Sequence, residues 1–288
     1  MRGRWQIINI SRAYGWGPGG LVRFMNLFDY LDTYMKIYTL IICFLFGSVM
    51  GSFLNCYASR ICHNESIVKG RSHCDACNHV LGILDLIPIV SYLINKGKCR
   101  YCGSKLSIRY LISEIVGGLS FVFIVLKFGF SLKTIEYLIL ISCMLAVSFA
   151  DMEDYLIPDR FIIVGIVNRV VFILIGNDIK SELLNSIIPA FVISGVMIIL
   201  VLVMEKILRK DAMGGGDIKL LFMLCLYNSL SLDLLGLLFS CVIGIIFGLI
   251  DTKGEKGKLF PFGPSICLGF FLVFMFGSSI VNWYLSLF

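Results

Sequence analysis

Residues 184–204, LNSIIPAFVISGVMIILVLVM, decide the fold of this chain, because they contain no charged side chain over a length that can cross a lipid bilayer. A helix of that length extends about 30 Å, which matches the hydrocarbon core. Seven other stretches are apolar over most of their length, although several include one or two charged residues, and 216–229 is the shortest of them. They are 37–56, 110–127, 135–151, 160–176, 216–229, 232–250 and 264–286. Since backbone groups find no water partners in hydrocarbon, each predicts a helix.

The composition agrees with this prediction. Of 288 residues, 58% are hydrophobic and only 15% are charged, and the mean hydropathy is +0.89. Soluble domains have about half apolar and a quarter charged residues, so this class is excluded. We therefore expect an all-α polytopic membrane protein with about eight transmembrane helices in a lipid bilayer. The modest net charge of +6 is better explained by membrane topology than by nucleic-acid binding, and no nucleic-acid partner is expected.

Lysine and arginine are distributed unequally between the two sides that these spans define. Sixteen lie in four loops on one side, whereas the other side holds three, Lys127, Lys133 and Lys180. Positive charge accumulates on the cytoplasmic side of bacterial membranes. The prediction is a multi-pass protein of the cytoplasmic (inner) membrane, with the first set of loops facing the cytoplasm. These loops are 57–109, 152–160, 205–219 and 251–263.

Residues 1–36 do not fit this topology, because their five basic residues oppose an N-terminus on the outer side. We treat this segment as an N-terminal extension. One hypothesis is that translation begins at Met35, and the alternative is an extension that lies on the membrane surface. A peptide from residues 5–20 in native material would exclude the first hypothesis.

A polar insertion at residues 60–109 contains two Cys-x-x-Cys pairs, separated by 21 residues: Cys74, Cys77, Cys99 and Cys102. Two such pairs can surround a tetrahedral Zn²⁺ ion with four thiolates. Each turn requires a residue that tolerates positive φ after its second cysteine, and Gly103 and Asn78 occupy these positions. The pattern predicts a structural zinc site. The alternatives are two disulfides, which a cytoplasmic location disfavours, and four unrelated thiols. The neighbouring His73 is expected to be an exposed polar residue.

Two aspartates lie where apolar spans meet the predicted cytoplasmic face. Asp151 ends the third span, and Asp217 follows Gly214, Gly215 and Gly216 at the start of the sixth. Two carboxylates close together share a proton, so that one can activate water while the other polarises a carbonyl group. The glycines would let a substrate backbone approach. Helix capping by Asp217 and a solvated loop at Asp151 remain the alternatives.

Several motifs around these residues resemble those of the type IV prepilin peptidases, which are aspartic membrane proteases of the GxGD type. The resemblance covers about residues 37–286. It rests on Gly214-Gly215-Gly216-Asp217-Ile218-Lys219, on Asp151 seven residues before Pro158, on Gly51-Ser52-Phe53-Leu54-Asn55, on Cys99-Arg100-Tyr101-Cys102-Gly103 with Arg109 and Glu114, and on Pro261-Phe262-Gly263-Pro264.

The resemblance implies a bundle of eight helices with a cytoplasmic zinc-binding insertion. It also implies cleavage of prepilins or pseudopilins after the glycine that ends a basic leader, with Asp151 and Asp217 as catalytic residues and Pro158, Gly214, Gly216 and Lys219 in support. Bifunctional members then methylate the new N-terminus with S-adenosylmethionine. Here the family's usual proline after Arg-Tyr is Leu111.

For the methyltransferase, the resemblance points to Asn55, Arg109 and Glu114. We divide the chain into a methyltransferase-type region with the zinc insertion, 37–134, and a peptidase region, 135–288. Two alternatives remain: a peptidase without methylation, and a non-catalytic zinc-containing membrane protein that serves assembly or transport. The pilus, secretion or competence system served and the oligomeric state are not predicted.

Overall fold

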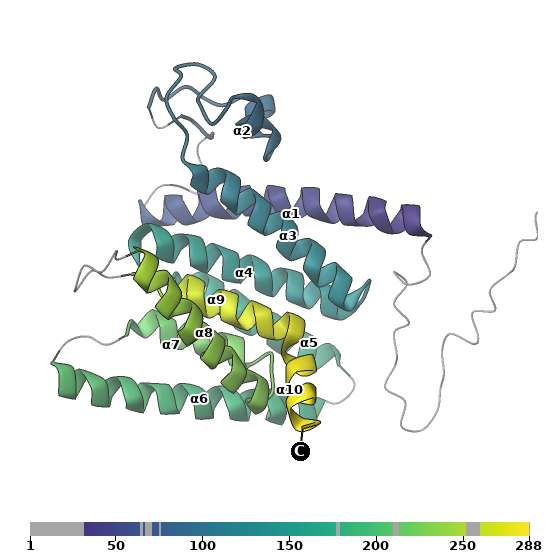
Figure 1. Cartoon of the computed structure of the whole chain (residues 1–288), viewed down its shortest axis with the longest axis vertical. Helices are drawn as coiled ribbons and strands as arrows, with labels where there is room; N and C mark the ends of the chain where they lie inside the picture. The colour runs from purple at the N-terminus through teal and green to yellow at the C-terminus, as the bar shows by residue number, and fades with distance from the viewer. Residues whose placement is uncertain are drawn as a thin grey trace, which may run out of the picture.

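The computed structural model describes residues 32–63, 66, 71–74, 76–176, 179–209, 213–251 and 260–287. Most of the N-terminal extension therefore lies outside the described residues. Within the described part of the chain the structure is helical, with two isolated β-bridges and no strands. The long helices lie side by side in one bundle, with α1 and α6 at opposite edges and α4 between them (Figure 1).

The order of elements follows the predicted spans. The helices are α1 Thr33–Cys62, η3 Ile83–Leu86, α2 Val90–Ile94, α3 Ile108–Phe128, α4 Leu132–Asp154, α5 Asp159–Ile175, α6 Ile179–Leu208, α7 Gly215–Cys225, α8 Leu230–Asp251, α9 Gly263–Leu272, the π-helix η4 Val273–Gly277 and α10 Ser278–Leu285. The last three form one continuous helical segment.

Among the described residues, six helical segments are long and apolar enough to cross a membrane: Thr33–Cys62, Ile108–Phe128, Leu132–Asp154, Ile179–Ile207, Leu230–Ile250 and Gly263–Leu285. The two other predicted spans are also helical, but α5 has 17 residues and α7 only 11. At 1.5 Å per residue, α7 extends only about 16 Å, roughly half of the hydrocarbon core. The about eight predicted spans thus correspond to six helical segments of full spanning length and two shorter helices. The shortest predicted stretch, 216–229, forms the shorter of these two, α7.

Apolar side chains are exposed on the outer helices and buried around α4. Phe191 and Ile199 on α6 are each 64% exposed, as expected where lipid takes the place of a protein neighbour. By contrast, α4 contacts α1, α3, α5 and α9, and most of its second half is buried. The protein is a multi-pass membrane protein in which α4 forms the centre of the bundle.

The first and third helices approach backbone to backbone. A Cβ atom added at Gly47 would lie 2.6 Å from the carbonyl oxygen of Gly117, so a side chain cannot fit there. Small residues permit such close packing in membranes, where van der Waals contact drives helix association. This contact places the polar insertion, which connects the two helices, beside the first turn of α3 and outside the bundle (Figure 1).

Candidate active site and metal centre

Asp151 lies in the last turn of α4 and is 5% exposed. Its Oδ2 accepts a hydrogen bond of 2.8 Å from the backbone N–H of Gly263, the first residue of α9. A Cβ atom at position 263 would lie 2.8 Å from the same oxygen. Only glycine therefore leaves room for the carboxylate of Asp151 against the start of α9.

Asp217 lies in the first turn of α7, after the three glycines. The two carboxyl groups are close enough to interact electrostatically, although they come from different helices. Both α4 and α7 contact α9, which brings their aspartates to one end of the bundle. Asp217 Oδ1 is buried and has no hydrogen-bond partner within the described part of the chain, which leaves it available to a substrate or a water molecule.

The motifs that contain the aspartates also contact each other directly. Lys219 Nζ lies 2.8 Å from Asp159 Oδ1, so the GGGDIK motif is paired with the residue that follows Pro158. Pro158 is buried and is the N-cap residue of α5. A Cβ atom at Gly216 would lie 2.9 Å from Cβ of Ile157, so the start of α7 packs closely against the loop between α4 and α5.

The structure thus brings together Asp151, Asp217 and the predicted supporting residues Pro158, Gly214, Gly216 and Lys219. Sequence analysis missed the role of Gly263, which it placed only within a family motif. The signal was available in part, since glycine is the residue expected wherever a backbone must approach another group closely. Its partner, however, is 112 positions away in the chain.

Arg109 and Glu114 occupy the junction between the insertion and the bundle. Arg109 Nη2 lies 3.3 Å from Oε2 of Glu153, two residues after Asp151, and Ser59 of α1 donates to the same carboxylate. Arg109 is therefore linked to the peptidase helix α4, which sequence analysis did not predict.

Glu114 is 7% exposed and accepts two hydrogen bonds. Its Oε1 accepts from Ser52 of α1 at 2.8 Å, and its Oε2 accepts from the backbone N–H of Ile89 in the insertion at 2.6 Å. Ile89 has a φ of +64°, a conformation that a β-branched residue rarely adopts. Glu114 thus attaches the insertion to α1 and α3, and Asn55 lies buried on the facing helix α1.

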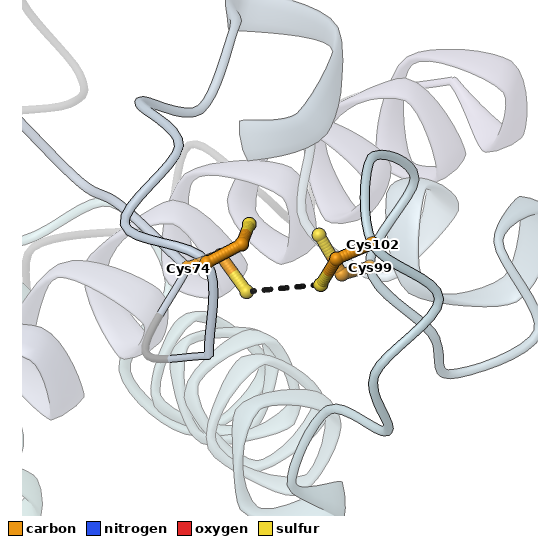
Figure 2. A group of neighbouring side chains, drawn as sticks. Cys74, Cys99 and Cys102 are labelled. Atoms are coloured by element: carbon orange, nitrogen blue, oxygen red, sulfur yellow. Dashed lines mark hydrogen bonds between the residues drawn. The ribbon is translucent and has the colours of Figure 1, made fainter.

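The four predicted cysteines form one cluster. Their sulfur atoms all lie within 4.8 Å of one another, and Figure 2 shows Cys74 facing Cys99 and Cys102 from a separate loop. The Sγ atoms of Cys74 and Cys102 are 3.9 Å apart. Four thiolates at 2.3 Å from a tetrahedral ion would be separated by about 3.8 Å. The arrangement can therefore hold a metal ion, and each of the four cysteines is present as a free thiol.

Both cysteine turns have the predicted backbone. Asn78 and Gly103 take φ values of 54° and 73°, and their N–H groups donate to the carbonyl oxygens of the first cysteine in each pair. The backbone N–H groups of Ala76 and Cys77 lower the pKa of the Cys74 thiol to about 6. A lowered pKa favours the thiolate of Cys74, the form that binds metals, whereas for Cys77 the lowering by the His79 backbone N–H is outweighed by desolvation and by the Cys102 and Cys74 side chains, which raise its pKa to about 11. The exposed His73 is not part of the cluster.

Two segments of the chain match the models of known protein families. Residues 45–128 match the model of the bacterial peptidase A24 N-terminal domain, and residues 138–249 match that of the type IV leader peptidase family. No solved structure is significantly similar.

Several similar proteins are named prepilin leader peptidase/N-methyltransferase, and three of them show the extent of the similarity. The Bacillus subtilis protein is 30% identical over 85% of this chain and 98% of its own length. The protein of Aeromonas salmonicida strain A449 is 28% identical over 84% of this chain and 92% of its own. The Neisseria gonorrhoeae protein is 29% identical over 77% of each chain.

Proposed function

This chain belongs to the type IV leader peptidase family, and we propose that it removes the basic leader of prepilins or pseudopilins with Asp151 and Asp217 and then N-methylates the new N-terminus. The observation that carries the proteolytic proposal is that the buried carboxyl group of Asp151, bonded to the start of α9, and the half-buried carboxyl group of Asp217 converge at one end of the bundle. Such a pair is suited to general acid–base hydrolysis of a peptide bond without a covalent intermediate.

The two aspartates have different surroundings, which supports different roles. Asp151 Oδ2 accepts a backbone N–H bond from Gly263, which stabilises an ionised carboxylate, whereas Oδ1 of Asp217 is buried and has no partner among the described residues, which favours the neutral acid. Asp151 is therefore assigned as the base that takes a proton from the attacking water. Asp217 is the acid that protonates the carbonyl oxygen as the water adds. As the diol collapses, one of its hydroxyl groups returns a proton to Asp217, the C–N bond breaks, and the proton held by Asp151 passes to the leaving amine, so that both aspartates regain their starting states.

Four supporting residues keep the first turn of α7 near Asp151. Gly214 leaves room for the carboxylate of Asp217, Gly216 allows α7 to pack against Ile157, and Lys219 pairs with Asp159 beside Pro158. A prepilin would present its cleavage point at the membrane interface, because its leader is basic and the following helix is apolar. Asp151 lies in the last turn of α4 and Asp217 in the first turn of α7, at the same end of the bundle. This position at a helix end would allow the pair to reach a cleavage point at the membrane interface.

The metal of the insertion is proposed to be zinc, held by Cys74, Cys77, Cys99 and Cys102. The donor set supports this, since four thiolates in two such turns are typical of structural zinc sites. When bound, zinc would supply a cross-link between two short loops and neutralise their thiolates. No open coordination position is needed, so a catalytic role is not assigned to it.

For methylation, we assign the methyltransferase-type region to residues 37–134 and the peptidase to 135–288. The two segments that match separate family models support this division. The S-adenosylmethionine cofactor is inferred from the names of the relatives. Arg109 and both carboxylate oxygens of Glu114 already bind protein groups. They and Asn55 therefore fit a positioning role better than direct contact with this cofactor.

The cysteine insertion and the aspartates are proposed to face the cytoplasm of a bacterial inner membrane. The excess of lysine and arginine in the loops on that side supports this orientation.

The test is leader removal by Asp151→Asn and Asp217→Asn, each reconstituted in lipid with a prepilin. We expect each variant to lose about 1,000-fold or more in kcat, because the carboxylates act as one unit. Both should still methylate a pilin that has already been cleaved. Normal leader removal by either variant would refute the assignment of the pair. Absence of methylation in the unmodified protein would favour a peptidase without the second activity.

A further inference from the structure

A second polar cluster lies at the opposite ends of α4 and α7 from the aspartates. At its centre is Arg169 of α5, whose side chain is only 15% exposed. Its Nη1 lies 2.8 Å from Oε1 of Glu136, a side chain that is 5% exposed. Its Nη2 donates to Ser186 at 2.9 Å and lies 3.8 Å from a carboxylate oxygen of Glu182.

The short helix α7 ends at this cluster. A helix leaves its last carbonyl groups without partners, and within a membrane the protein itself must provide them. Arg169 Nε donates to the carbonyl oxygen of Leu226, the residue that follows α7, at 2.9 Å. The adjacent Tyr227 is also held, since its hydroxyl donates to the Gly165 carbonyl at 2.6 Å and accepts from Asn168 at 2.8 Å.

These contacts connect the two helices that carry the aspartates. Glu136 and Asp151 both lie on α4, about 22 Å apart along the helix axis. Leu226 and Asp217 are separated by about 14 Å along the axis of α7. Arg169 therefore binds one end of each helix, while the aspartates occupy the other ends. A shift or rotation of the rigid α7 at Leu226 would move Asp217 relative to Asp151.

We infer that Arg169 is a positioning residue for leader cleavage, which sets the depth and rotation of α7 against α4 through Glu136 and the Leu226 carbonyl. The inference rests on the proposed function of the aspartates. A role in folding alone is the competing explanation. Buried ion pairs contribute little or no net stability relative to apolar residues of the same size, which argues against that explanation. Intramembrane charges also tend to mark functional sites.

The test compares Arg169→Met/Glu136→Gln with Arg169→Lys in lipid-reconstituted full-length enzyme. The double variant removes both charges, so neither is left unpaired. We expect its kcat for leader removal to fall by roughly 30- to 100-fold, as small displacements of catalytic groups do, with KM changed by less than about 3-fold. The kcat of Arg169→Lys should lie between those of the double variant and the unmodified enzyme. Lysine has a single ammonium group in place of the forked guanidinium and cannot bind Glu136 and the Leu226 carbonyl at the same time. Methylation of a pre-cleaved pilin should stay near the unmodified value, and the midpoint of thermal unfolding should fall by only a few degrees, because the Leu226 carbonyl loses its partner.

Lys133→Gln is the matched control, since it removes an exposed cation from the same end of α4. It should leave every parameter unchanged. Unchanged kcat in the double variant would overturn the inference. So would a parallel fall in cleavage, methylation and unfolding temperature, because this pattern indicates loss of folding. Failure of the proposed function is distinguishable: Asp151→Asn or Asp217→Asn would then cleave normally, whatever the Arg169 variants do.

Discussion

Cys74 and Cys102, the outer members of the cysteine cluster, are 28 positions apart, whereas Asp151 and the N–H of Gly263 that binds it are 112 positions apart. The cysteine turns are closed by their own local hydrogen bonds and by residues suited to positive φ. The aspartate site has no comparable local structure, and its parts come from α4, α7 and α9. One region is therefore specified by short-range chemistry, and the other by the packing of helices.

This difference predicts how each region fails. Loss of one ligand should affect the insertion locally, because its turns and the ion stabilise each other. Displacement of α4, α7 or α9 should affect the aspartates, because contacts between these helices bring the two carboxyl groups together. The following predictions test this comparison, beginning with the largest expected effect.

Cys99→Ser should lower metal affinity by more than about 100-fold, since even the loss of an outer-shell partner costs roughly 10- to 100-fold. Metal content of the purified protein measures this, with the exposed Cys241→Ser as the matched control. Retention of one tightly bound ion per chain in Cys99→Ser would contradict the four-thiolate site.

Gly263→Ala should lower kcat for leader removal by about 10- to 100-fold, because the added Cβ would displace the carboxylate of Asp151. Steady-state cleavage kinetics measure this. Gly195→Ala is the control, since that glycine also lies in a helix but has no heavy atom within 4 Å of its added Cβ. Equal activity of the two variants would show that the Gly263 contact does not position Asp151.

Lys219→Gln should change leader removal by less than about 5-fold, because exposed ion pairs contribute at most about 1 kcal/mol. Lys219 and Asp159 are 56% and 61% exposed. Cleavage rates at low and high salt measure this, and the difference from the unmodified enzyme should shrink as salt screens the pair. A 100-fold loss would instead indicate that Lys219 acts on the substrate or on Asp217 directly.

Much of the fold could be read from the sequence because membrane helices follow simple rules. Each of the eight apolar stretches is helical, and their order is as predicted. The prediction was least accurate for 216–229, where α7 ends at Cys225. The stretch becomes polar at Asn228 and Ser229, close to the end of α7, but only the tertiary structure shows that Arg169 provides the partner of the Leu226 carbonyl, which lets the helix end within the bundle.

The sequence by itself determined the class of protein, the positions of the helices and the four cysteines of the cluster. It also singled out Asp151 and Asp217 as candidate catalytic residues. Composition, apolar length and local spacing are sufficient for these, because each depends on neighbours in the chain. Only the tertiary structure decided that Gly263 binds Asp151, that Glu114 attaches the insertion at Ile89, and that Arg169 connects α4 to the end of α7. These contacts join residues that are distant in the chain, and helix packing alone fixes which of them meet.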